Sequence, residues 1–119
     1  MDKINLAEKF ARFRDPWRPR IVAELNGQHV KLARLDGEFV WHKHDAEDEL
    51  FFVVEGRLRM EFRERSVTLG PGELIVVPRE VEHHPVAEVE TLVMLFEPAG
   101  TVNTGDAASP RRVERLEWI

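Results

Sequence analysis

The sequence predicts an all-β fold, either a sandwich or a barrel, preceded by one short helix. Turn signals recur at short intervals, at Asn26–Gly27, Asp36–Gly37, Glu55–Gly56 and Gly70–Gly72. The segments between them are short and rich in β-branched and aromatic residues, which favours strands. Many short strands at this spacing are typical of antiparallel sandwiches and barrels.

The first element is a helix, which we expect within about residues 3–13. Leu6, Phe10 and Phe13 recur at helical spacing and would share one face, and Asn5 is a suitable N-cap. No later segment has helical spacing, so the rest of the fold has to be built from strands.

The strands are expected to form a barrel over about residues 20–98. Each lies between turn signals, and the expected bounds are Ile21–Leu25, Gln28–Leu35, Glu38–Lys43, Leu50–Val54, Leu58–Phe62, Leu74–Val77 and Thr91–Phe96. Residues 99–119 form the expected C-terminal tail. Its first part is loop-like, and Asn103, Thr104 and Gly105 form either a loop over the barrel mouth or a simple turn. Its last part, Arg111–Ile119, alternates in polarity like an edge strand.

Composition limits the chemistry that the chain can perform. A length of 119 residues predicts one domain, and 43% hydrophobic residues suffice for one core. The sequence has no Cys, which excludes disulfides, thiolate metal ligands and a cysteine nucleophile. It also has no Tyr, a common acid–base side chain.

Charge and hydropathy limit the partners. The net charge of −5 gives no basic surface for nucleic acid. The sequence has no long apolar stretch and no signal-like start, so we expect no membrane association and a cytoplasmic location. A small-molecule ligand or substrate, anionic ones included, remains the expected partner.

Histidines and a carboxylate suggest a metal site. His42 and His44 are two residues apart, so on a strand both point to one side of the sheet. Glu49 follows at the start of the next strand, and His83 comes after several strands. Imidazole and carboxylate donors together suit one divalent transition metal ion: Zn, Mn, Fe, Ni, Co or Cu.

Two segments resemble the motifs of the cupin superfamily. Gly37–Gly56 contains His-x-His-x4-Glu-x6-Gly and is similar to the first motif, and Gly72–His83 is similar to the second. The resemblance implies a small, single-domain, metal-binding cupin over residues 1–119. Its fold would be a double-stranded β-helix, or jelly-roll barrel, with His42, His44, Glu49 and His83 converging inside.

Two features of the motifs leave alternatives open. Glu47 and Asp48 compete with Glu49, although the spacing favours Glu49; a one-residue slip would exchange His83 for His84. Glu80 also stands where the second motif usually has glycine, and it would be strained if that position requires a positive φ.

A regular strand through His42 fixes which neighbours face the metal. Alternation places Val40, Phe51 and Val53 on the inside and Phe39, Trp41, Phe52 and Val54 on the outside. The same alternation makes Glu38 a weak candidate for proton transfer, and proximity to His83 makes His84 another.

Three functions agree with these residues. The first is a metal-dependent enzyme that acts on a sugar, a uronate or a related polar carbonyl compound by isomerase-type proton transfer. The second is a metal-dependent oxygenase or a polyketide-cyclase-like enzyme, and the third is a non-catalytic barrel that binds a small ligand. We also expect a homodimer, since Trp17, Trp118 and Ile119 offer apolar surface near the chain ends.

Overall fold

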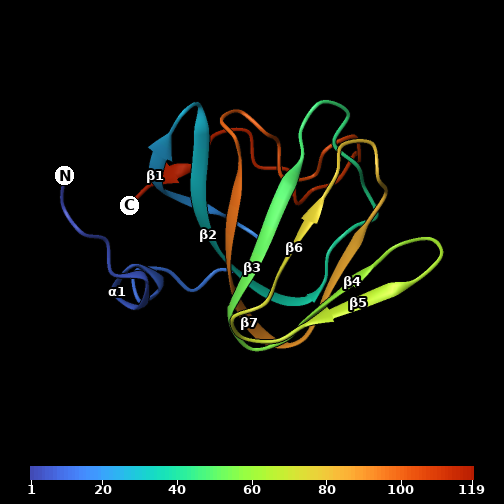
Figure 1. The fold of residues 1–119 in the computed structure, drawn as a ribbon, viewed down its shortest axis with the longest axis horizontal. Coiled ribbons are helices and arrows are strands. Elements are labelled where there is room, and N and C mark those ends of the chain that lie inside the picture. The colour runs from blue at the N-terminus through green and yellow to red at the C-terminus, as the bar shows by residue number, and fades with distance from the viewer.

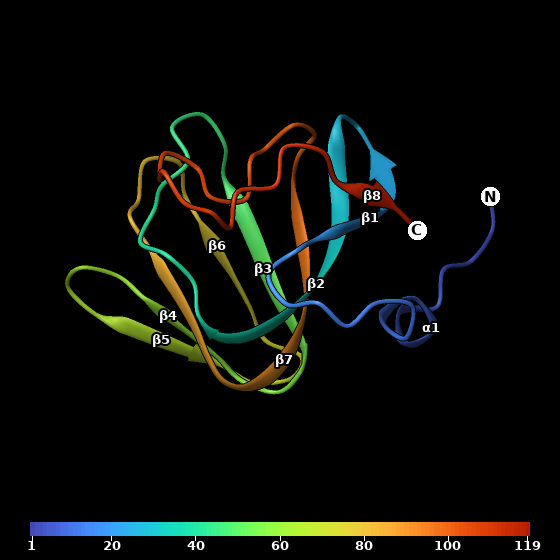
Figure 2. The same ribbon diagram turned by 180° about the vertical axis from the view of Figure 1, so that it is seen from behind.

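The computed structural model describes residues 1–119 as a β-barrel with one short helix at its side (Figures 1 and 2), so the predicted fold class is confirmed. The elements are α1 (Leu6–Phe10), β1 (Arg20–Leu25), β2 (Gln28–Glu38), β3 (Glu49–Glu55), β4 (Leu58–Glu61), β5 (Ser66–Leu69), β6 (Leu74–Val77), β7 (His84–Pro98) and β8 (Glu117–Trp118). No helix is long and apolar enough to cross a membrane.

The long strand β7 organises the barrel. Along one edge it pairs antiparallel with β2 from Gln28 to Glu38. Along the other edge, its first residues pair with β4 and its last residues with β3. The strand order is β5-β4-β7-β2-β1-β8, and β6 joins through β3. Inward side chains of these strands form one apolar core that includes Leu35, Val53 and Val93.

The helix is shorter than predicted but begins where predicted. The Asn5 side chain accepts a hydrogen bond from the Glu8 amide at 3.0 Å, which satisfies one of the free N–H groups of the first turn. Phe10 and Phe13 pack with Leu32 of β2 in a second apolar cluster outside the barrel interior. The helix therefore covers part of the outer face of the sheet.

The predicted strand Glu38–Lys43 was wrong, because the chain leaves the sheet after Glu38. The Phe39 amide donates to the Pro85 carbonyl at 3.0 Å. Pro85 has no N–H to return, so the ladder stops there. Contact resumes only as an isolated bridge between His42 and His83.

Two other strand predictions need correction. Strand β5, only four residues long with two of them polar, was not predicted, because it depends on its pairing with β4. The prediction that β7 begins at Thr91 was also wrong, because it starts at His84. The first half of β7 does not look like a strand in the sequence, because it contains Pro85 and the exposed charges Glu88 and Glu90. Long-range pairing to β2 and β4 holds it in the sheet.

The chain ends differ in how they meet the barrel. Trp17 is only 6% exposed: its Nε1 donates to the Asp36 carbonyl at 2.8 Å, and its ring stacks on Phe39. The prediction that Trp17 offers surface for a partner was therefore wrong. The tail crosses one end of the barrel and finishes beside β1, where β8 pairs in parallel (Figure 2). The predicted C-terminal edge strand is confirmed for Glu117 and Trp118 alone.

Glu80 adopts the positive φ that glycine would tolerate, with φ +69°. Its amide donates to the His44 carbonyl at 2.7 Å, so this turn connects the two motif segments. The conformation places Cβ near the following carbonyl, and the penalty exists for every residue except glycine.

Replacing Glu80 by glycine is expected to raise the free energy of unfolding by about 0.5–1 kcal/mol. The substitution relieves the backbone strain of the folded state, and the higher entropy of glycine in the unfolded chain offsets part of this gain. Denaturant unfolding measures the change. The Glu80→Ala variant is the control, since it keeps Cβ and is expected to show no such gain. Equal stability of the two variants would contradict the strain.

Candidate metal centre

Four buried side chains meet at one end of the barrel. His42, His44, Glu49 and His83 each offer one ligand atom, and these atoms all lie within 4.8 Å of one another. The structure thus brings together the residues that the two motifs indicated. Because a divalent ion holds its nitrogen and oxygen ligands at about 2 Å, atoms this close can share one ion.

Backbone pairing positions these ligands. The His42 amide donates to the His83 carbonyl at 3.1 Å, and the His83 amide donates to the His42 carbonyl at 2.9 Å. Glu49 is the first residue of β3 and lies opposite Val77, the last residue of β6. Glu49 thus lies at the start of a strand, and the three histidines lie in segments outside the named strands. Backbone pairing fixes these segments relative to each other.

Local hydrogen bonds orient two of the rings. The Nδ1 atom of His42 lies 2.9 Å from the Val40 carbonyl, and that of His83 lies 2.9 Å from the Val81 carbonyl. A carbonyl only accepts, so each Nδ1 carries the proton and each Nε2 keeps its lone pair. Metal-binding histidines commonly have this second hydrogen bond.

Unsatisfied buried atoms show that the cluster fits a cation. His44 Nε2, His83 Nε2 and Glu49 Oε1 are buried without a hydrogen-bond partner. The two nitrogens lie 3.3 Å and 3.5 Å from Glu49 Oε1, but neither contact is a well-directed hydrogen bond. Three orphaned atoms in one buried site would be costly. A shared divalent ion would satisfy all three.

The electrostatics agree with this arrangement. Burial, reinforced by the neighbouring His83, lowers the pKa of His42 to about 4, so its ring is neutral. For His44, burial acts to lower the pKa, but the close contact with the negatively charged Glu49 carboxylate outweighs it and raises the pKa. For Glu49, burial acts to raise the pKa, but the imidazoles of His44 and His83 hold it well below its usual range. Glu49 is therefore deprotonated, as a carboxylate ligand of a metal has to be.

The competing residues lie elsewhere. Asp48 is exposed and accepts hydrogen bonds from the backbone and side chain of Arg79. His84 is held 2.8 Å from Glu61, and its ring stacks on Trp41. Glu47 is not among the clustered ligands.

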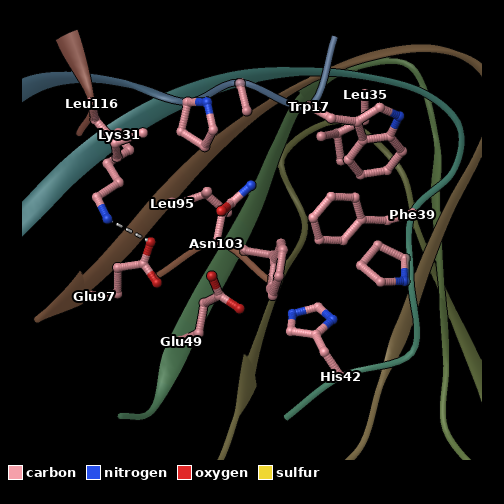
Figure 3. Close-up of a pocket in the computed structure, with 14 residues that line it drawn as sticks. Trp17, Lys31, Leu35, Phe39, His42, Glu49, Leu95, Glu97, Asn103 and Leu116 are labelled. Carbon is pink, nitrogen blue, oxygen red and sulfur yellow. Dashed lines mark hydrogen bonds and ion pairs between the residues drawn. The ribbon is translucent and has the colours of Figure 1, made fainter. Parts of the chain in front are cut away.

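A small cavity adjoins the cluster. The cavity has a volume of about 40 Å³, which is enough for about three water molecules. Figure 3 shows His42 and Glu49 beside it, with Phe39 on the same side as His42 and Trp17 beyond Phe39. Neither Glu38 nor His84 lines it.

The predicted orientations hold for β3 and for His42 and His44, but the prediction for Phe39 was wrong. Phe51 and Val53 are buried inside the barrel as expected. Phe39, predicted to face outward, lines the cavity, and its ring meets His42 edge to face at 5.4 Å between centroids. The reason is again the broken strand, because alternation applies only where the backbone stays extended.

Sequence reasoning missed several residues of the cavity. Lys31 of β2 and Glu97 of β7 line it, and their side chains lie 3.0 Å apart. Burial and the charge of Glu49 raise the pKa of Glu97 well above its usual range. One signal was available, since Lys31 shares a strand face with the apolar Ala33 and Leu35. Trp17, Asn103 and Leu116 come from the chain ends and carried no signal.

The C-terminal tail is attached to the segment that carries the ligands. The Asp106 amide donates to the Lys43 carbonyl at 3.0 Å, and the Lys43 amide donates to Asp106 Oδ1 at 2.8 Å. Gly105 has φ +54°, and a Cβ built there would lie 2.2 Å from the Lys43 carbonyl oxygen. Because Asn103 lines the cavity, this part of the tail is a loop over the mouth rather than a simple turn.

Comparison with known proteins decides the family. The model of the cupin domain family Cupin_2 matches residues 27–97, more than half of the chain. The chain belongs to the cupin family. Its two sequence motifs and its strand topology are those of a small cupin.

Individual proteins are similar to this chain over most of its length. The crystal structure of a cupin-2 domain protein from Shewanella frigidimarina is 46% identical, covers 80% of this chain and 93% of its own, and has a TM-score of 0.79. A structure from Neisseria meningitidis is 33% identical, covers 82% and 100%, and has a TM-score of 0.76. The protein YdbB of Bacillus subtilis is 32% identical over 64% of this chain and 68% of its own.

Replacing Gly105 by alanine is expected to lower the free energy of unfolding by about 2–4 kcal/mol, through the positive φ and the overlap with the Lys43 carbonyl. Gly100→Ala is a matched control in the same tail, because Gly100 has φ +89° but nothing within 4 Å of a built Cβ. It is expected to cost about 1 kcal/mol or less. Thermal unfolding compares the two, and equal losses would contradict the tight docking of the tail.

Proposed function

We propose that this cupin is a metal-dependent enzyme that acts on a small polar carbonyl compound, such as a sugar or uronate end, by isomerase-type proton transfer. The observation that carries the proposal is that His42 and Glu49 belong to the ligand cluster and also line the cavity. An ion held by the four side chains would keep one or two positions open toward that cavity.

The ion would supply Lewis acidity, which polarises a carbonyl or hydroxyl oxygen. The chain itself provides orientation and a dry surrounding. Phe39 and Phe51 flank the ligands on the cavity side, and Trp17 closes the far end against Phe39. Exclusion of water strengthens every charge interaction at the centre.

The apolar half of the cavity supports a second candidate. Trp17, Leu95 and Leu116 line the cavity together with other apolar residues. Such a surface also suits the apolar part of a substrate for an oxygenase or a polyketide-cyclase-like enzyme. Oxygen uptake by the Fe(II)-loaded protein separates this candidate from the isomerase, which consumes no O₂.

The metal dependence is tested by metal content. We expect about one transition metal ion per chain in protein purified without chelators, and loss of the ion in the His42→Ala/His44→Ala variant, because two of four ligands are removed. The His84→Ala variant keeps all four and serves as control. Mass spectrometry of the metals gives the stoichiometry. A native protein that stays empty after incubation with Zn, Mn, Fe, Ni, Co and Cu would contradict the proposal.

Proton transfer is tested separately in D₂O. The loaded protein is expected to exchange a hydrogen next to the carbonyl of its substrate with solvent, followed by proton NMR on a panel of sugars, uronates and hydroxyketones. If the metal-loaded protein exchanges no hydrogen of any of these compounds with solvent, the oxygenase is favoured over the isomerase.

We further propose that a second copy of the chain covers the outer face of β6, β3 and β7. Two cross-strand rows of apolar side chains lie there, and the register defines them: Leu74, Phe52 and Met94 in one row, and Val76, Leu50 and Phe96 in the other. Leu74 and Val76 are 54% and 51% exposed. Strands that are apolar on both faces are usually buried on both.

The Leu74→Glu/Val76→Glu variant is expected to be monomeric where the native protein is a dimer, because charges cannot be desolvated in an apolar interface. Light scattering after gel filtration measures the mass. Val89→Glu is the control, since Val89 is equally exposed, at 51%, but lies outside the two rows. A monomeric native protein would contradict the proposal.

A further inference from the structure

A buried ion pair lies on the wall of the cavity beside the metal ligands. Lys31 and Glu97 are only 1% and 2% exposed, and Lys31 Nζ lies 3.0 Å from Glu97 Oε1. Figure 3 shows Glu97 and Glu49 facing the same space, with Lys31 on the other side of Glu97 from His42. Both residues of the pair line the same cavity as the two ligands.

A buried ion pair is a poor source of stability for a barrel of this kind. Two charges removed from water lose much of their hydration energy, and apolar residues of similar volume are often equally stabilising. The neighbours on the same strand faces are in fact apolar, namely Ala33 and Leu35 beside Lys31 and Leu95 beside Glu97. A polar pair at this position therefore calls for a functional explanation.

The pair has unused hydrogen-bonding capacity. An ammonium group has three N–H donors, and Lys31 directs its hydrogen bonds at Glu97 Oε1 and, at 3.4 Å, at the Thr101 carbonyl. Glu97 Oε2 is buried without any hydrogen-bond partner. One acceptor and one donor are thus left beside the cavity. A hydroxyl group complements both of them, and a carbonyl oxygen complements the donor alone.

We propose that the Lys31–Glu97 pair is a second polar anchor of the cavity, and that it binds the hydroxyl or carbonyl oxygen of a short hydroxy- or keto-carboxylate whose carboxylate lies at the metal centre. The inference rests on the proposed function, and it names the class of substrate for that site.

The net charge around the cavity favours a ligand that carries a carboxylate. A divalent ion with one ligand carboxylate and three neutral imidazoles has a net charge of +1. The Lys31–Glu97 ion pair adds no net charge to it. In an apolar cavity this excess favours a ligand with a negative charge of its own. No arginine lines the cavity, so Lys31 is the one cationic side chain there.

The volume of the cavity favours a short ligand. Room for about three waters corresponds to about three to six non-hydrogen atoms. A three-carbon hydroxy acid fits these limits, whereas a whole hexuronate fits only if the tail, through Asn103 and Leu116, moves away from the mouth.

The test compares two ligands that differ by one hydroxyl group. 3-Hydroxypropionate and propionate are titrated by calorimetry into the full chain loaded with Co(II), whose absorption spectrum reports ligand binding at the metal. The native protein is expected to prefer 3-hydroxypropionate by about tenfold or more, as for a hydrogen bond to a charged group.

The Lys31→Met/Glu97→Met variant removes both charges at nearly constant volume, so it is expected to keep its melting temperature and its Co(II) while the preference falls to about one. The Glu97→Gln variant retains an acceptor for Lys31 and replaces the other oxygen by an amide donor, and it is expected to lose the preference as well. Glu8→Gln/Arg12→Met, which removes an ion pair on the exposed helix, is the control and keeps the preference.

Each other outcome overturns the anchor. Folded, loaded variants that retain the preference show that the pair does not contact the ligand. Variants that lose Co(II) show that the pair serves Glu49 instead. A native protein that loads Co(II) but does not distinguish the ligands contradicts the anchor alone. A native protein that takes up no metal contradicts the proposed function, and the anchor fails with it.

Discussion

The reciprocal backbone hydrogen bonds between His42 and His83 are the constraint on which the rest of the site depends. They join the two motif segments after the regular ladder has stopped at Pro85, and they set the two rings side by side with centroids 4.2 Å apart. Continuous pairing would have kept the first motif extended and turned Phe39 away from the centre. The interrupted ladder therefore builds both the ligand cluster and the aromatic wall of the cavity.

The molecule also buries several ionisable side chains close together. Glu49, Glu97 and Lys31 are all removed from water within one end of the barrel. In a protein of this size, such a concentration of ionisable groups costs free energy unless the groups pair with each other, with an ion or with a ligand. The pairing within the chain is incomplete at one unpartnered buried atom each of His44, Glu49, His83 and Glu97.

The sequence predicted what depends on local spacing. The turn signals, the Asn5 cap and the two motifs follow from a few adjacent residues, and the structure has each of them. The motif also raised the question of a positive φ at Glu80, which the structure answers with φ +69°. The sequence could not predict what depends on pairing between distant segments. The partners of Lys31 and Trp17 lie far away in the chain, and the strand break at Phe39 is caused by a proline on another strand.

We expect one ion to bind between the two motifs, and anomalous X-ray diffraction from crystals of metal-loaded protein would locate it. The expected result is a single anomalous peak per chain within about 2.3 Å of His42 Nε2, His44 Nε2, a Glu49 carboxylate oxygen and His83 Nε2. A peak held by other side chains, or loaded crystals with no peak at this cluster, would contradict it.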